Sequence, residues 1–167
     1  MKNRKKSETI ILIIGAIILV VGLLIPASGK LALLDELFGV LVIVCFIAYA
    51  LLAVFNSENI KGKMTKPIKI LILAACVIIV GLFSKDLAFD LISGPEQTVL
   101  QDLTTSQYQG YTGIFSSHYY IEGYDSDNNR IKIEVSKDDF MKMSSSKSAT
   151  VKYFKNTGRA LSLSIER

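Results

Sequence analysis

The residues of this chain that could carry chemistry gather between residues 108 and 129, and they form no complete catalytic set. His118 is the single histidine. A zinc site needs three or four ligands, chiefly histidine or cysteine, and the two cysteines, Cys45 and Cys76, lie far away in apolar runs. No serine stands in a Gly-x-Ser-x-Gly sequence. We therefore expect a non-enzymatic protein with no catalytic residue, no metal site and no cofactor.

Asp125, Asp127 and Asn129 alternate as the first three ligands of an EF-hand loop do. The match ends there, because Arg130 replaces the required glycine and Ser136 stands where a bidentate glutamate belongs. Asx side chains also favour tight turns, and this stretch lies between two β-rich segments. We interpret it as a hairpin turn, with calcium binding as the alternative.

Tyrosines are the remaining candidates. Tyrosine supplies contact area at low entropic cost and is enriched at interfaces, although it is also a good strand former. Two of the tyrosines are consecutive, so one of them should face away from a β-sheet core. The candidate partner-binding surface consists of Tyr108, Tyr111, Tyr119, Tyr120 and Tyr124.

Three apolar runs precede these residues, at 9–28, 37–55 and 67–84. The first two are uncharged and, at about 1.5 Å per residue, long enough for the roughly 30 Å hydrocarbon core of a bilayer. The third is shorter, but Lys69 and Lys85 at its ends can snorkel towards the lipid headgroups. We expect three transmembrane helices in a multi-pass protein of the cell membrane.

Lysine placement sets the expected orientation. The N-terminal residues 1–8 and the loop before the third run are rich in Lys and Arg, whereas the loop between the first two runs holds one lysine and two acids. The positive-inside rule puts the N-terminus in the cytoplasm and residues 95–167 outside. Residues 1–84 carry a net charge of +5 and residues 85–167 a net charge of −1, by counts of 9 basic and 4 acidic against 10 and 11. We read the basicity as a topology signal and expect no nucleic-acid partner.

Within the membrane region, 9–93, the three runs contain no Asp, Glu, His or Arg. Such groups at depth mark ion pathways and intramembrane catalysis, so their absence from the runs argues against a transporter. Residues 86–93 are expected to continue as a juxtamembrane helix ended by Gly94-Pro95. An alternative for the first run is a cleaved signal peptide.

Beyond residue 95 the apolar period changes to two, which indicates β-structure. Segments at 97–103, 108–115, 118–124 and 130–135 are β-rich; the second holds Gly110 and Gly113, which suggest a bend. Ser136 favours an N-cap for a short helix ending near Met143, and a hairpin at 150–154 and 160–166 follows. Three strands, a helix and two strands predict an OB-like five-stranded barrel, with an SH3-like barrel or an open sheet as alternatives.

The layout resembles that of the short NfeD-like membrane proteins, in which a few helices carry a small C-terminal OB-type domain. Their glycine-rich first strand is not matched by residues 97–113, so no functional residue is carried over. The cysteine-free exported segment and the Ile- and Lys-rich composition suggest a Gram-positive bacterium. We expect an accessory or immunity-type protein whose β-domain binds a protein or envelope partner. The alternatives are a structural subunit packed against other membrane subunits, and an enzyme with an unrecognised site.

Overall fold

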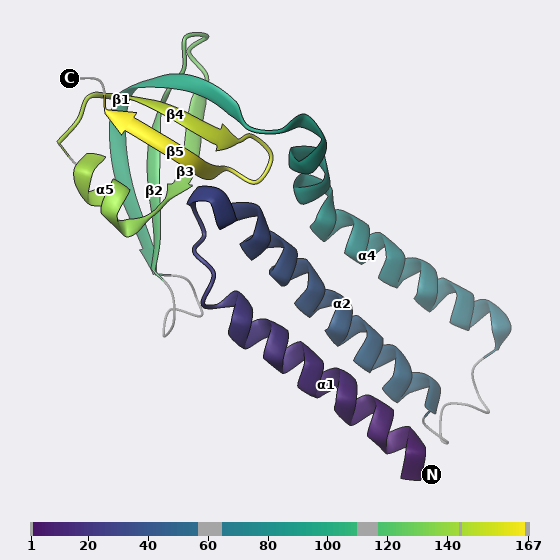
Figure 1. The fold of residues 1–167 in the computed structure, drawn as a ribbon. Helices are drawn as coiled ribbons and strands as arrows, with labels where there is room; N and C mark the ends of the chain where they lie inside the picture. Colours follow the sequence, from purple (N-terminus) through teal and green to yellow (C-terminus); the bar gives the residue numbers. More distant parts are fainter. Residues whose placement is uncertain (1, 57–64, 110–116, 144, 166–167) are drawn as a thin grey trace. The chain divides into compact units, whose positions relative to one another are not determined.

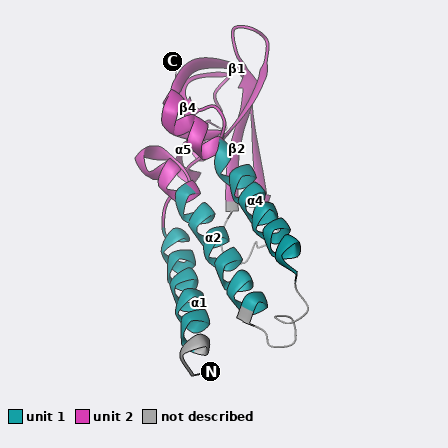
Figure 2. Cartoon of the chain, turned by 90° about the vertical axis from the view of Figure 1, so that its right-hand side faces the viewer, with its two compact units in different colours: residues 1–24, 37–85 teal, residues 25–36, 86–167 magenta. Residues whose placement is uncertain are grey.

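The computed structural model describes residues 2–56, 65–109, 117–143 and 145–165, and the chain divides into two compact units (Figures 1 and 2). The helical unit comprises residues 1–24 and 37–85, and the barrel unit comprises residues 25–36 and 86–167. The barrel unit therefore contains a segment that lies far from the strands in the sequence. The domain boundary expected at 94–95 stays a prediction.

Long helices dominate the first half of the chain: α1 (Lys2–Gly22), α2 (Ala32–Asn56) and α4 (Lys66–Ser93). Among the described residues, two helical stretches, Gly29–Phe55 and Lys66–Ser93, are long and apolar enough to cross a membrane. This supports two of the three expected spans. Membrane crossing by α1 stays a prediction.

The helical unit exposes many large apolar side chains, among them Leu71 at 71% and Val77 at 72%. Helices α1 and α2 approach each other closely at two glycines. A Cβ on Gly15 would lie 3.1 Å from Cys45, and one on Gly22 would lie 3.2 Å from Phe38. The contact later in α1, at Gly22, is with the earlier residue of α2, Phe38. The two helices therefore run antiparallel.

The barrel unit holds five strands that close in the order β1-β2-β3-β5-β4 (Figure 1). The expected order of three strands, a short helix and two strands is confirmed, and the barrel is closed. The likeness to an OB barrel stays a prediction. The elements are β1 (Glu96–Gln109), β2 (Ser117–Tyr124), β3 (Arg130–Val135), α5 (Lys137–Met143), β4 (Ser148–Phe154) and β5 (Arg159–Ile165).

Strand β1 is one continuous strand where the sequence suggested two segments, and it pairs with both β2 and β4. Its register shifts between Gln101 and Thr104, and Asp102 has a φ of 51°. Such a bulge bends the strand, as closure of a small barrel requires. Gly123 lies opposite the bend, where a Cβ would be 2.8 Å from the Gln101 carbonyl oxygen. The bend expected at Gly110 and Gly113 falls outside the described residues.

Alternate side chains of the strands fill the barrel. Helix α5 adds Met143 to this core, and Phe140 packs against it. The N-cap expected for α5 is confirmed, since Ser136 Oγ accepts a hydrogen bond from Asp139 N–H at 3.1 Å and donates one to the Asp139 carboxylate at 2.8 Å. The buried core residues are Leu100, Ile121, Ile133, Val135, Met143, Ala149, Val151, Tyr153 and Ala160.

Candidate functional site

The outer face of the barrel carries a band of polar and aromatic side chains across β1, β2, β3 and β5. Strand pairing sets it in rows: Ser106 is opposite Tyr120, Tyr120 opposite Glu134, and Glu134 opposite Arg159. Side chains alternate along a strand, so these residues lie on the face opposite the core. We call this band the outer polar face; it comprises Ser106, Tyr108, His118, Tyr120, Glu122, Arg130, Lys132, Glu134 and Arg159.

Tyr108, Tyr120 and Lys132 form a compact cluster on this face, which we call the Tyr–Lys stack. The two rings meet edge to face with centroids 5.8 Å apart, and Lys132 Nζ lies 4.4 Å from both centroids. Contacts of this kind act through the ring quadrupole and each favour the observed arrangement by about 0.5–1.5 kcal/mol. Tyr108 remains 55% exposed. The stack therefore presents a pre-organised aromatic surface to the surroundings.

Glu122 joins the stack to the neighbouring positive charges. Its carboxylate accepts a hydrogen bond from Arg130, lies 3.4 Å from Lys132 Nζ and accepts a hydrogen bond from Ser106 Oγ at 3.4 Å. Burial raises the pKa of Glu122, but the hydrogen bonds from Arg130 and Lys132 outweigh that and hold it below its ordinary value. Glu122 is thus ionised at neutral pH and fixes Lys132 beneath the rings.

A second cluster, the Arg159 network, lies within the barrel unit where β5 meets residues 25–36. The Arg159 side chain is only 11% exposed. Its guanidinium lies 2.6 Å from Glu36 Oε1, 3.1 Å from Asp35 Oδ2 and 2.9 Å from Glu134 Oε2, and donates to the Ala27 carbonyl at 3.3 Å. One arginine therefore joins a segment from the first half of the chain to strands β3 and β5.

Three carboxylates surround this one guanidinium, so the network carries an excess of negative charge. Burial lowers the pKa of Arg159, but Glu134, Glu36 and Asp35 together raise it above its ordinary value. His118 Nδ1 lies 2.6 Å from the other Glu134 oxygen. The Glu134 carboxylate thus contacts both Arg159 and His118.

Tyr120 contacts both clusters. Burial first, and then the nearby Glu134 carboxylate, raise the pKa of Tyr120 above its ordinary value. Its hydroxyl is therefore neutral at physiological pH and available as a hydrogen-bond donor to Glu134. His118 stacks on the same ring with centroids 6.4 Å apart. The arrangement is rigid and polar, which suits recognition of a partner.

The last turns of α4 also belong to the barrel unit. Asp90 is 1% exposed and accepts hydrogen bonds from the backbone N–H of Asn156 at 3.0 Å and of Thr157 at 2.7 Å. The Asn156 side-chain amide adds a third bond at 2.7 Å. Leu87, one turn earlier on the same helix face, is buried, whereas Ile92 is 84% exposed. Residues 86–93 thus continue α4 and fasten it to the β4–β5 turn.

The predicted tyrosine surface separates into parts. Tyr108 and Tyr120 lie together in the Tyr–Lys stack, and Tyr124 is exposed at the end of β2. Tyr119 points the other way and packs against Phe140 with ring centroids 5.1 Å apart. Tyr111 lies outside the described residues. The structure thus brings two of the five tyrosines into contact on the outer face.

The Asp125 carboxylate is used by its own turn, where Oδ1 accepts from the N–H groups of Asp127 at 2.9 Å and Asn129 at 2.8 Å. This is the Asx geometry expected of a hairpin turn. Over residues 2–56, 65–109, 117–143 and 145–165, no group of His, Cys, Asp and Glu is arranged to hold a metal. The connector after α5 also has the spacing Ser-x-x-Lys, from Ser144 to Lys147, and Ser144 is outside the described residues.

Sequence reasoning missed the Arg159 network entirely. Arg159 follows a turn glycine and precedes the alternating pattern of β5, so it resembles a solvated strand end. One signal was available: Asp35-Glu36 places two adjacent acids between an apolar loop and an apolar helix, where an unpaired charge is costly.

A scan against protein-family models and searches of curated proteins and of solved structures find no match to this chain.

Proposed function

We propose that the chain is a multi-pass membrane protein with three spans, α1, α2 and α4, a cytoplasmic N-terminus and an exported barrel of OB type. The lysine asymmetry supports the orientation. The length of α4 supports a span that continues beyond the lipid: 28 residues reach about 42 Å, roughly 12 Å more than a bilayer core, so its last turns can leave the lipid. Strand order and the position of α5 support the OB assignment.

The exported barrel binds a protein or envelope partner through its outer polar face. The observation that carries this proposal is the Tyr–Lys stack, because Tyr108 is 55% exposed although its ring is held in place by Tyr120 and Lys132. Rigid, exposed aromatic side chains make good anchors, since little rotational freedom is lost on binding. The role is accessory or immunity-type.

A non-enzymatic role is favoured because the charged groups of the face are committed to one another. Arg130 and Lys132 pair with Glu122, and Glu134 pairs with Arg159. These pairs neutralise the charges of the face within the protein and hold the side chains in relation to one another. The same side chains are well suited to fix a binding surface.

Site-specific photo-crosslinking in intact cells tests the proposal. A benzophenone amino acid replaces Tyr108 in one strain, exposed Ser162 on β5 in a second, and Val77 on α4 in a third. Adducts at position 108 that are absent at 162 support binding by the outer face. Adducts at position 77 alone favour the alternative of a structural subunit of a transporter or secretion complex. Equal yields of adducts at positions 108 and 162 would refute the proposal that the outer polar face binds the partner.

Orientation has its own test. A phosphatase reporter that folds only outside the cytoplasm, fused after Arg167, should be active, and a reporter that is active only in the cytoplasm should be silent. The reverse pattern would overturn the proposed topology.

A further inference from the structure

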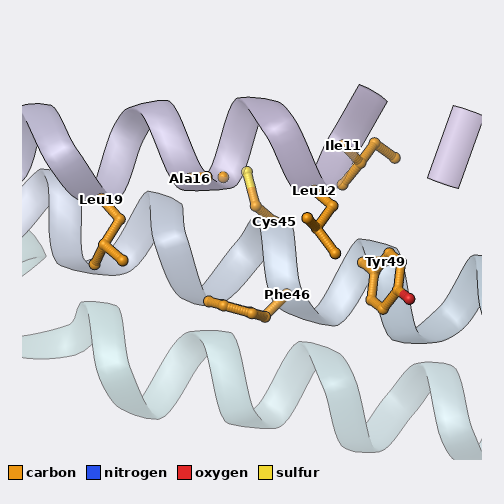
Figure 3. A pocket seen from close by; sticks show the side chains of 8 residues that line it. Ile11, Leu12, Ala16, Leu19, Cys45, Phe46 and Tyr49 are labelled. Carbon is orange, nitrogen blue, oxygen red and sulfur yellow. The ribbon is translucent and has the colours of Figure 1, made fainter. Parts of the chain in front are cut away.

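A hollow of about 180 Å³ lies between α1 and α2 in the helical unit, and its walls are almost wholly apolar (Figure 3). Tyr49 stands at the same end as Ile11 and Leu12, and Leu19 stands at the other end (Figure 3). We call this hollow the α1–α2 groove. Its lining residues are Ile11, Leu12, Gly15, Ala16 and Leu19 of α1, and Cys45, Phe46 and Tyr49 of α2.

The dimensions of the groove match a hydrocarbon chain. From Ile11 to Leu19 it extends about 12 Å along α1, close to the depth of one leaflet in a hydrocarbon core of roughly 30 Å. An acyl chain has no polar group that needs a hydrogen-bond partner, so it suits walls that are almost wholly apolar.

The charge at one end of the groove selects the lipid. Ile11 is five residues after Lys6, about 7.5 Å along the helix axis, and Lys6 is exposed. The first turns of α1 carry four basic residues, Lys2, Arg4, Lys5 and Lys6, against one acid, Glu8. Clustered basic residues at the cytoplasmic end of a span attract anionic headgroups. Tyr49 of α2 stands at this same end of the groove (Figure 3).

We propose that the α1–α2 groove holds one acyl chain of an anionic phospholipid of the cytoplasmic leaflet, whose headgroup lies beside the basic N-terminal residues. The proposal rests on the proposed topology, in which α1 and α2 both span the bilayer. A chain seated there restores the dispersion contacts that an empty apolar hollow lacks. The bound lipid would be a fixed part of the helical unit rather than freely exchanging solvent.

Because the chain has no tryptophan, the fluorescence of a single introduced tryptophan can be measured without background from other tryptophans. Phe46→Trp introduces one fluorophore at the groove, and Val77→Trp introduces one on the exposed side of α4 as a control. Each full-length variant is reconstituted in phosphatidylcholine vesicles that contain an equal, small fraction of brominated phosphatidylglycerol or brominated phosphatidylcholine. Bromine quenches tryptophan only in close contact, so the fluorescence loss reports which acyl chains lie at each position.

We expect brominated phosphatidylglycerol to quench Phe46→Trp several-fold more than brominated phosphatidylcholine, and both lipids to quench Val77→Trp alike. Adding Ala16→Phe, which fills the groove, should abolish the preference. Adding Lys5→Gln and Lys6→Gln should also reduce it, since a basic residue at an anionic surface is worth on the order of fivefold in binding. Tyr49→Trp serves as a second reporter if Phe46→Trp does not fold.

The outcomes separate the lipid site from the topology. Equal quenching of the groove tryptophan by the two lipids, with the control also quenched, overturns the lipid site and leaves the spans intact. Quenching that is equally strong with the Ala16→Phe filling present also overturns it. If neither lipid quenches at position 46 or 77, the helices are not in hydrocarbon, and both the topology and the lipid site fail.

Discussion

Replacing Arg159 by methionine tests the energetic weight of the Arg159 network. Methionine keeps much of the apolar stem but leaves Asp35, Glu36 and Glu134 without their shared counter-charge. Breaking a buried ion pair by removing one partner typically costs about 3–5 kcal/mol. The 11% exposure of the arginine and its hydrogen bonds to Glu36 and the Ala27 carbonyl place it in that class. For a domain of this size the melting temperature should fall by roughly 12 °C or more.

The matched control is Arg130→Met, which also removes an arginine from a carboxylate. That side chain is 67% exposed, so the loss should be about 0–1 kcal/mol. Near-ultraviolet circular dichroism of the full chain in detergent is a suitable assay, because six of the seven tyrosines lie in the barrel unit and the chain has no tryptophan. A melting temperature for Arg159→Met within a few degrees of Arg130→Met would refute the argument from burial.

A double-mutant cycle gives the sharper result. Arg159→Met combined with Glu134→Gln removes the guanidinium and one of the carboxylates that it leaves unpaired. The pair should be coupled by about 0.5–3 kcal/mol, so the double variant should be more stable than the sum of the single losses implies. Strict additivity would mean that the two groups do not interact in solution.

Three further changes test other features. Gly123→Ala places a Cβ 2.8 Å from the Gln101 carbonyl oxygen, so the free energy of unfolding should fall by about 1–3 kcal/mol in the same melting assay. Gly39→Ala lies in helix α2 with open space around it and should instead stabilise the protein, by up to about 1 kcal/mol. Glu122→Gln should destabilise the barrel at neutral pH. Because the folded-state pKa of Glu122 is lowered, its contribution to stability is present above the unfolded pKa, about 4.5, and is lost as the pH falls through the folded value. The melting temperatures of the parent protein and of Glu122→Gln should therefore converge in acid. A difference that stays constant with pH would contradict the role of the ion pair. Asp90→Leu leaves the Asn156 and Thr157 amides unpaired and should cost about 1–3 kcal/mol per group. Hydrogen exchange at those two amides should accelerate, and unchanged exchange would show that the turn does not depend on α4.

Local chemistry made several elements predictable from the sequence. The Ser136 cap, the Asp125 turn and the alternation of the last hairpin all depend on residues within a few positions of one another. The positions of the strands and of α5 followed from these signals. Features that depend on pairing partners are harder to predict: the sequence indicates two segments where β1 is one strand, because its bend is set by contacts with β2 and β4.

The candidate site was predictable only in part. Alternation indicated that Tyr119 and Tyr120 face opposite sides, but the choice between them is made by Phe140, which packs on Tyr119 from α5. Lys132 approaches the rings of Tyr108 and Tyr120 only because β1, β2 and β3 are adjacent. The Arg159 network joins residues 123 positions apart, and no local pattern in a single sequence encodes such a contact.

That separation has a consequence for how the protein is made. At a synthesis rate of roughly 5–20 residues per second, the 123 residues between Glu36 and Arg159 take about 6 to 25 s to translate. Throughout that interval the acidic start of α2, with Asp35 and Glu36, has been synthesised without the guanidinium that will neutralise it. The barrel therefore completes its charge balance only near the end of translation. An excised fragment of residues 95–167 would retain Arg159 and Glu134 but lack Asp35, Glu36 and Asp90, so soluble production should include residues 25–36 and 86–94, joined by a linker.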